Sequence, residues 1–246
     1  MCLSYHFCYS NLSAKFNLNT MKTFKSLTLI CIAFFTLLTS CKKDKKQPNC
    51  KIITVNMGAQ NFVINYDEQN RIASVVSGST TRTYVYTGST ITITETNGGS
   101  FSKRKIVTVG ANNMPVNLRE EQNTAGTLWM NSAFEYNGTE LSRLTQTGSG
   151  GTAPAVVTYT WANGNPVSAS SGSTTNVIAV DASKPAQAGD FSWFSAFYHE
   201  WITVLKPKNL ITSIAGSTFT YTFDSDNKIS SLISGGTTVS YNYTCN

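Results

Sequence analysis

Histidine is nearly absent from this sequence, which has two histidines in 246 residues, and only His199 lies beyond the first twenty positions. A Ser-His-Asp triad would have to use His199, yet no Gly-x-Ser-x-Gly motif supplies a matching nucleophile. Paired histidines and Cys-x-x-Cys, the usual sources of metal ligands, are also missing. We therefore predict that the protein is not an enzyme and has no catalytic residue, metal or cofactor. The alternative is a cryptic hydrolase whose carboxylates meet only in the fold.

A long hydrophobic run is also missing. The longest uncharged apolar run is residues 27–38, twelve residues, whereas a helix that crosses a bilayer needs about 20. This run follows the short basic stretch of residues 21–26, and its last residue begins Leu38-Thr39-Ser40-Cys41, which resembles a lipobox. The order of basic stretch, apolar run and small residues is that of a secretory signal. We predict that residues 21–40 are a lipoprotein signal peptide and that Cys41 carries lipid. An ordinary signal or an uncleaved anchor is the alternative.

Residues 1–20 contain one cation, Lys15, and none of the features of a signal peptide. We interpret Met1 as a misassigned start and Met21 as the true start.

The positive charge of the chain is concentrated at its N-terminal end. Five lysines and one acid in residues 41–51 give +4, whereas eleven Lys/Arg and twelve Asp/Glu in residues 52–246 give −1. Residues 41–51 are therefore predicted to be a basic tether, and residues 52–246 a single, nearly neutral domain. Binding of nucleic acid needs a basic stripe, so it is not expected.

Few cysteines remain once the leader and the lipid site are set aside. Cys50 and Cys245 are the two left, one at each end of the domain. In an oxidising envelope compartment, an isolated pair of this kind is most simply a disulfide. Two unrelated free thiols are the alternative.

The domain has a β pattern throughout. Short runs rich in Thr, Val, Ile, Tyr and Phe are separated by Gly, Asn, Asp and Ser at intervals of about 8–12 residues. Several runs alternate a large apolar residue with Thr or Ser, which predicts one dry and one wet face. The fold class is therefore all-β, an antiparallel up-and-down meander that forms a large curved sheet or barrel.

An internal repeat supports this class. Its unit is a large apolar residue, any residue, an aromatic, a polar turn and an aliphatic strand, and each copy predicts one hairpin. The copies begin at Ile64, Phe134, Tyr159 and Tyr221. Residues 224–227, Asp-Ser-Asp-Asn, have oxygens in a calcium-like spacing but lack the complete loop, so we interpret them as a turn.

These residues carry a resemblance. The stretch from Phe219 to Ile229, with residues 238–243, resembles a family of Gram-negative envelope lipoproteins with a domain of unknown function described as porin-like. The hairpins are also similar to the tyrosine-aspartate repeats of cell-surface proteins, which usually have Gly where this chain has Asn70 and Asn227. The resemblance covers most of residues 52–245. It implies a many-stranded antiparallel sheet or barrel in the envelope, and it supplies no catalytic residue.

One segment departs from the β pattern. Phe191, Phe194, Tyr198, Trp201 and Leu205 recur at spacings of 3, 4, 3 and 4, which predicts a short amphipathic helix. Asp190 is a suitable N-cap, and Pro207 lies just beyond the end. Such a helix covers a sheet face or plugs a barrel mouth. Alternatively, its aromatics line a ligand pocket or touch a membrane, with Trp193, Tyr198, His199 and Trp201 as candidate ligand-contacting residues.

The leading functional hypothesis is a non-enzymatic binding or scaffold module of the cell envelope, anchored by lipid on Cys41 and located at the outer membrane. A binder of a glycan or a small apolar ligand is the second hypothesis, and an envelope protein is a further possible partner. An integral membrane barrel is disfavoured, because the apolar runs of about five to seven residues are shorter than the 9–11 needed.

Overall fold

The structure is a computed structural model that describes residues 50–198 and 204–245. This part of the chain contains sixteen β-strands and one α-helix. The strands are β1 (Cys50–Met57), β2 (Gln60–Tyr66), β3 (Ile72–Ser77), β4 (Thr80–Thr87), β5 (Thr90–Asn97), β6 (Ser100–Val109), β7 (Pro115–Glu121), β8 (Trp129–Asn137), β9 (Glu140–Gly148), β10 (Ala155–Ala162), β11 (Asn165–Ser171), β12 (Thr174–Pro185), β13 (Asn209–Ile214), β14 (Ser217–Phe223), β15 (Ile229–Ser234) and β16 (Thr237–Cys245). The helix is α2 (Phe191–Tyr198).

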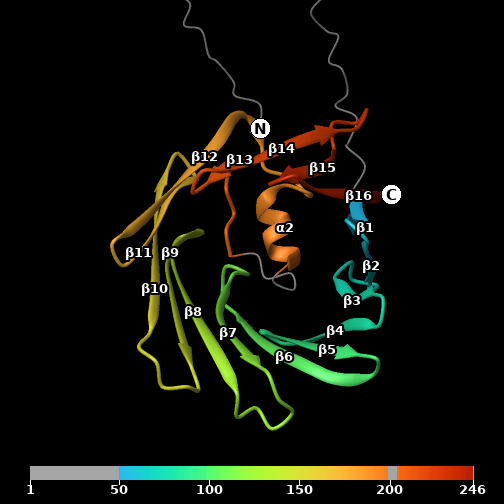
Figure 1. Cartoon of the computed structure of the whole chain (residues 1–246), viewed down its shortest axis with the longest axis vertical. Helices are drawn as coiled ribbons and strands as arrows, with labels where there is room; N and C mark the ends of the chain where they lie inside the picture. The colour runs from blue at the N-terminus through green and yellow to red at the C-terminus, as the bar shows by residue number, and fades with distance from the viewer. Residues whose placement is uncertain (1–49, 199–203, 246) are drawn as a thin grey trace, which may run out of the picture. The chain divides into compact units, whose positions relative to one another are not determined.

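The sixteen strands form a closed barrel (Figure 1). Each strand pairs with its neighbours along the chain, every pair is antiparallel, and β1 pairs with β16 to complete the ring. The predicted up-and-down meander is confirmed, and the alternatives of curved sheet and barrel resolve to a barrel. The first strand begins at Cys50, two residues before the predicted start of the domain.

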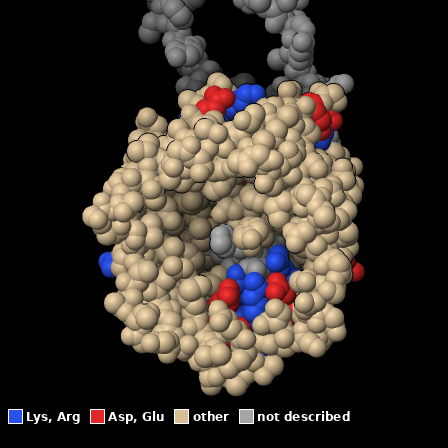
Figure 2. Space-filling view, in the orientation of Figure 1, with Lys and Arg blue, Asp and Glu red and all other residues tan. Residues whose placement is uncertain are grey.

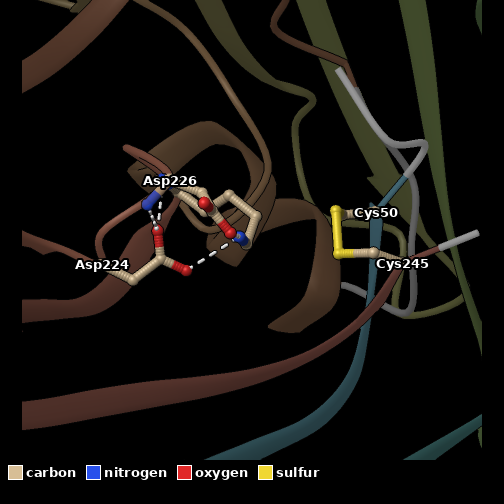
Figure 3. Close-up of a disulfide and its surroundings, with 5 residues drawn as sticks. Cys50, Asp224, Asp226 and Cys245 are labelled. Atoms are coloured by element: carbon tan, nitrogen blue, oxygen red, sulfur yellow. Dashed lines mark hydrogen bonds and ion pairs between the residues drawn. A yellow bond between two sulfur atoms is a disulfide. The ribbon is translucent and has the colours of Figure 1, made fainter. Parts of the chain in front are cut away.

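The predicted disulfide joins the two strands that close the ring. Cys50 lies opposite Cys245 in the β1–β16 register, their Cα atoms are 4.1 Å apart, and the two sulfurs are bonded (Figure 3). The prediction of a Cys50–Cys245 bridge is confirmed. The bridge covalently joins the first and last strands.

Period-two alternation places most of the large apolar side chains on the inner face of the barrel, whereas the outer face is mostly polar with single exposed valines such as Val85 and Val177. Facing inward, Ile64 lies opposite Val75 on the next strand, and both are buried. Facing outward, Thr83 lies opposite Thr94. The buried core is therefore on the inside of the ring.

The four segments predicted to be hairpins form β2–β3, β8–β9, β10–β11 and β14–β15, and the turns of the first and the last explain the asparagines at positions 70 and 227. Asn70 and Asn227 adopt φ values of 64° and 61°, a left-handed conformation that Asn tolerates better than most residues. The Asp224 carboxylate accepts backbone N–H bonds from Asp226 and Lys228, each at 2.9 Å (Figure 3). These carboxylate oxygens thus hold their own turn together, as the turn interpretation predicts.

Helix α2 lies inside the ring of strands (Figure 1). The predicted N-cap is confirmed: the Asp190 carboxylate accepts the backbone N–H of Trp193 at 2.8 Å and that of Gln187 at 2.9 Å. Asp190 itself is buried. The helix thus begins where the sequence predicts.

The predicted helix differs from the structure in its burial and its extent. Phe197, which was not in the predicted stripe, is the most buried residue of the helix, and Tyr198, which was, is 59% exposed. A stripe pattern assumes one flat surface beneath the helix, whereas the barrel wall surrounds α2 and packs aromatics on several sides. Leu205 lies in irregular chain rather than in the helix, and Trp201 falls outside the described residues.

Within residues 50–198 and 204–245, no helix is both long and apolar enough to cross a membrane.

Candidate functional site

The inner wall of the barrel carries the aromatic and charged side chains that could contact a ligand. It divides into an aromatic side and a charged side. On the aromatic side, Phe197 of α2 meets Phe62 edge to face, with ring centroids 5.1 Å apart. Phe191 stacks on Phe219 at 4.2 Å. These contacts fill the space between the helix and strands β1, β2, β14, β15 and β16.

The charged side lies on strands β4 to β7. Five residues form what we call the inner charged patch: Arg82, Glu95, Lys103, Lys105 and Glu120. The Arg82 Nε atom lies 2.8 Å from Glu95, the Lys103 Nζ atom lies 3.8 Å from Glu95, and the Lys105 Nζ atom lies 3.0 Å from Glu120. The patch therefore offers both hydrogen-bond donors and acceptors to a polar ligand.

The strand register places this patch on the inner wall. Arg82 lies opposite Glu95, and Lys105 lies opposite both Ile93 and Glu120. Because Ile93 belongs to the buried core, its partners share the inward face. Figure 2 shows blue and red atoms gathered within the hollow, over the strands labelled β5 to β7 in Figure 1.

The inner charged patch is not among the residues predicted from the sequence, although the sequence contains a signal for it. In the run Ile91-Thr92-Ile93-Thr94-Glu95, the glutamate continues the inward phase of the two isoleucines. Lys105 and Val107 share one phase in the same way. When a charged residue occupies a strand position that is in step with the apolar, inward-facing residues, its side chain is predicted to face inward as well.

A second charged cluster lies on the outer face and is structural. The Glu121 carboxylate accepts bonds from the Nε atoms of Arg104 at 2.8 Å and Arg119 at 2.9 Å. These hydrogen bonds, that of Arg119 first, hold the pKa of Glu121 below its usual range, although burial opposes them. The Arg119 guanidinium also lies 4.8 Å from the centre of the Trp129 ring. The cluster connects β6, β7 and β8.

One mouth of the barrel contains both ends of the described domain, and we call it the tether-side mouth. Odd strands begin there and even strands end there, so it includes Cys50, Cys245 and the turn at residues 110–114. A cavity of about 570 Å³ at this mouth is lined by Arg71, Tyr86, Gly88, Ser89, Ile91, Val109, Gly110 and Asn113. A neighbouring cavity of about 290 Å³ is lined by Gly110, Ala111, Asn112, Met114, Val116, Phe134, Tyr136 and Gly138. The two cavities share Gly110.

Two of the four predicted ligand-contacting residues, Trp193 and Tyr198, lie within the described part of the chain. Trp193 is packed within the barrel, parallel to Phe197 at 5.8 Å and edge to face with Tyr241 at 5.3 Å. Tyr198 is the exposed aromatic of α2. His199 and Trp201 lie outside the described residues, as does the predicted lipidation site Cys41. Of the four residues, the described part of the chain therefore places two, Trp193 inside the barrel wall and Tyr198 at an exposed position.

No cluster of three or more His, Cys, Asp or Glu side chains that could hold a metal occurs in the described part of the chain. The two carboxylates of the inner charged patch are each engaged by a cation, and strand β6 separates Glu95 from Glu120. This is the arrangement of an ion-pair network.

Comparison with known proteins places this architecture among solved structures. No family model and no curated protein sequence matches the chain. The fold is similar to a crystal structure of a porin-like protein from Bacteroides uniformis, with a TM-score of 0.57 at 16% identity over 78% of this chain and 98% of that one. A crystal structure of a porin-like protein from Bacteroides vulgatus is similar at a TM-score of 0.54 and 14% identity, with the same coverages of 78% and 98%. At these identities the likeness concerns the fold, a porin-like closed barrel.

Proposed function

We propose that this protein is a non-enzymatic binding module of the cell envelope, a barrel that stands in water, is held to the membrane by lipid on Cys41, and binds its ligand inside. The observation that carries the proposal is the polarity of the two faces. Outward positions on neighbouring strands pair Thr83 with Thr94, Asn65 with Ser74, and Thr160 with Ser168. The aromatic and charged side chains described above face inward.

This arrangement is the reverse of a barrel embedded in lipid. A transmembrane barrel has an outward apolar band about 25 Å tall, with polar residues in its interior. The strands here are 6 to 12 residues long, so the length argument drawn from the sequence does not by itself separate the two kinds of barrel. The Thr and Ser residues of the outer face favour a barrel that stands in water, because a lipid-facing wall would be apolar.

The tether is consistent with anchoring rather than insertion. Nine residue steps separate Cys41 from Cys50, so the tether reaches at most about 32 Å when fully extended. A lipid on Cys41 thus keeps the barrel near the bilayer surface while leaving its polar outer wall in water. The four lysines between Cys41 and Cys50 add weak attraction to anionic headgroups.

The interior supports a binding role. An inner wall with an aromatic side, a charged side and cavities at one mouth has the composition of a ligand site, which combines apolar walls with a few placed polar groups. Glu95 is paired with Arg82, and Glu120 is paired with Lys105. A general acid or base must exchange a proton with the substrate, so carboxylates that are already held by cations favour the recognition of polar groups over acid–base chemistry.

A Cys41→Ala variant tests the anchoring. If the barrel stands in water, Cys41→Ala should move the protein from the membrane fraction to the soluble envelope fraction, and mass spectrometry of the wild-type protein should find acyl chains on Cys41. A barrel inserted in lipid would stay in the membrane fraction without its lipid. That result, or a wild-type protein without acyl chains, would overturn the proposal.

A further inference from the structure

The larger cavity of the tether-side mouth has the size of a small-molecule site. Its volume of about 570 Å³ falls within the range of about 300–1,000 Å³ that such sites occupy. The lining combines apolar side chains, among them Ile91 and Val109, with the polar side chains of Ser89 and Asn113. Arg71 is the one charged residue of this lining. The cavity therefore offers apolar surface, hydrogen-bond donors and a single positive charge.

The Arg71 guanidinium is fixed on two sides. Its Nε and Nη2 atoms lie 2.8 and 2.7 Å from the same carboxylate oxygen of Asp67. Its central carbon lies 4.1 Å from the centre of the Tyr86 ring. The Tyr86 hydroxyl in turn donates to the Ile72 carbonyl at 2.9 Å, which holds the ring in place. A guanidinium that is already held in this way loses little further freedom when a ligand binds.

One nitrogen of this guanidinium remains available to a ligand. Nε and Nη2 are used by Asp67 and Gln69, whereas Nη1 makes no hydrogen bond within residues 50–198 and 204–245. The Arg71 side chain is 46% exposed, so solutes can reach it. A guanidinium has five N–H donors, and Asp67 is not part of the cavity lining. A second carboxylate can therefore bind at Nη1 while Asp67 keeps its place.

We propose that this cavity binds a small amphiphilic carboxylate, such as a fatty acid of medium chain length, with its head group on Arg71 and its hydrocarbon body against Ile91 and Val109. The head group is favoured because hydrogen bonds between a guanidinium and a carboxylate are charge-assisted. The hydrocarbon body is favoured because its contact with the apolar lining removes apolar surface from water.

The inference deepens the proposed function and rests on it. A lipid on Cys41 would hold the tether-side mouth within about 32 Å of the bilayer surface, where amphiphiles collect. The site would then face the source of its ligand.

Octanoate and 1-octanol are probes that separate the head group from the chain, because they have the same number of carbons and differ in charge. Binding of each probe is measured by equilibrium dialysis of the full chain held in a non-ionic amphipol, against the amphipol alone. Because amphipol holds either a lipid-anchored or an inserted barrel, this result does not depend on the outcome for Cys41→Ala.

Arg71→Gln tests the head group. The variant should bind octanoate about threefold to tenfold more weakly than the wild type and 1-octanol about equally, a modest effect because Arg71 is half-exposed and already paired. Raising the salt from about 0.05 to 0.5 M should weaken octanoate binding by the wild type but not by the variant, since salt screens exposed charges. Arg143→Gln is the matched control and should bind octanoate as the wild type does. Arg143 is 48% exposed and paired with Glu135, yet it lines neither cavity of the tether-side mouth.

Ser89→Trp tests the cavity. The indole should occupy the space and weaken both probes by about tenfold or more. Ser89 is exposed in the two-residue turn between β4 and β5, so the barrel should still fold. Ser79→Trp is the matched control and should leave both affinities unchanged. Ser79 is exposed and follows Gly78 in the β3–β4 turn at the opposite mouth, as Ser89 follows Gly88.

Three outcomes would overturn the site: no binding of octanoate by the wild type, an unchanged octanoate affinity in Arg71→Gln, or unchanged affinities for both probes in Ser89→Trp. The second would leave an apolar cavity without a head-group contact, and the third would place the binding elsewhere. A wild type that binds neither probe, together with release of Cys41→Ala from the membrane, would refute the site and keep the proposed anchoring.

Discussion

At the scale of single residues, buried polar side chains satisfy the backbone where the strands end. Three tyrosines at the tether-side mouth are half-buried, and each has a hydroxyl that donates to a backbone carbonyl of the preceding strand and a cation above its ring: Tyr66, Tyr86 and Tyr243. Lys51 lies 5.0 Å from the centre of Tyr66, and Arg71 lies 4.1 Å from that of Tyr86. Each tyrosine thus combines a hydrogen bond, an apolar contact and a cation–π contact in one side chain.

Tyr66 should make the stability of the barrel depend on alkaline pH. Burial raises the pKa of its hydroxyl to about 12, from an ordinary value of about 10. The folded state therefore keeps a proton that the unfolded chain loses. The stabilisation is complete below about pH 10 and is lost as the pH rises toward 12. Urea unfolding between pH 9 and 12 is expected to show this decline, and Tyr66→Phe should reduce its slope; an unchanged slope would contradict the assignment to Tyr66.

Asn209 should be one of the most sensitive polar residues. Its side-chain nitrogen donates to the carbonyls of Ala182 and Lys184 at 3.1 Å, and its side-chain oxygen accepts from Asn165 at 3.0 Å. Asn209→Ala leaves buried partners unsatisfied, so we expect a loss of about 2–3 kcal/mol in the free energy of unfolding. Asn61, exposed on β2, is the control, and Asn61→Ala should change it by less than about 0.5 kcal/mol. Equal losses in the two variants would contradict the role of burial.

At the scale of elements, α2 is fixed inside the barrel by its cap and by its aromatic contacts. The backbone N–H of Phe191 lies 3.3 Å from the Tyr221 hydroxyl oxygen. The Tyr243 hydroxyl shares its one proton between the Ile229 carbonyl at 2.7 Å and the Ala188 carbonyl at 3.1 Å. The start of the helix is therefore attached to both β14 and β16. Its position depends on these strands being in place.

Asp190 should couple the helix to pH. Burial raises the pKa of its carboxyl above the ordinary value, although the N–H groups of Trp193 and Gln187 favour the ionised form. The folded state thus favours the protonated form more than the unfolded state does. The contribution of this group to stability is greatest below the ordinary pKa of about 4 and decreases as the pH rises through the higher folded value.

Asp190→Ala should cost about 1–2 kcal/mol at pH 7 because it removes the cap. Asp190→Asn should cost less, since an amide oxygen can still accept the Trp193 N–H, and it should remove the carboxyl's pH dependence. Urea unfolding at pH 4 and pH 7 measures both effects. Asp226→Ala, at an exposed carboxylate, is the control. If Asp190→Asn were as costly as Asp190→Ala, capping would not be the explanation.

The elements also show how far the sequence predicts this structure. Local features were predictable, because the turn at Asn227 and the cap at Asp190 depend on residues within a few positions. The residues of the Asn165–Asn209 pair are 44 positions apart in the sequence, so no local pattern predicts their contact. The burial of Phe197 was missed for the same reason, since it depends on Phe62, which is far away in the sequence. Alternation placed Glu95 and Lys105 on one face, but only closure of the ring made that face an interior.

At the scale of the whole molecule, the ring closes only when the first strand meets the last. The β1–β16 register runs from Cys50 opposite Cys245 to Met57 opposite Val239, with one irregularity between Ile52 and Thr54. Val55 and Tyr241, paired in this seam, are both buried in the core. Closure therefore combines strand pairing, apolar burial and a covalent bond, and it leaves no unpaired edge in the sheet.

The disulfide should contribute strongly to stability because the loop that it closes is long. The two cysteines are separated by 195 positions, for which the loop-entropy model gives an upper value of about 5 kcal/mol. A Cys50→Ser/Cys245→Ser variant should lose up to this amount while keeping the barrel, since the β1–β16 hydrogen bonds and the buried Val55–Tyr241 pair remain. Thermal and urea unfolding with and without dithiothreitol measure the loss. The reductant should lower the stability of the wild-type protein to that of the double variant and leave the variant unchanged. A wild-type protein that is insensitive to the reductant, and no more stable than the variant, would show that strand pairing and burial alone hold the ring closed.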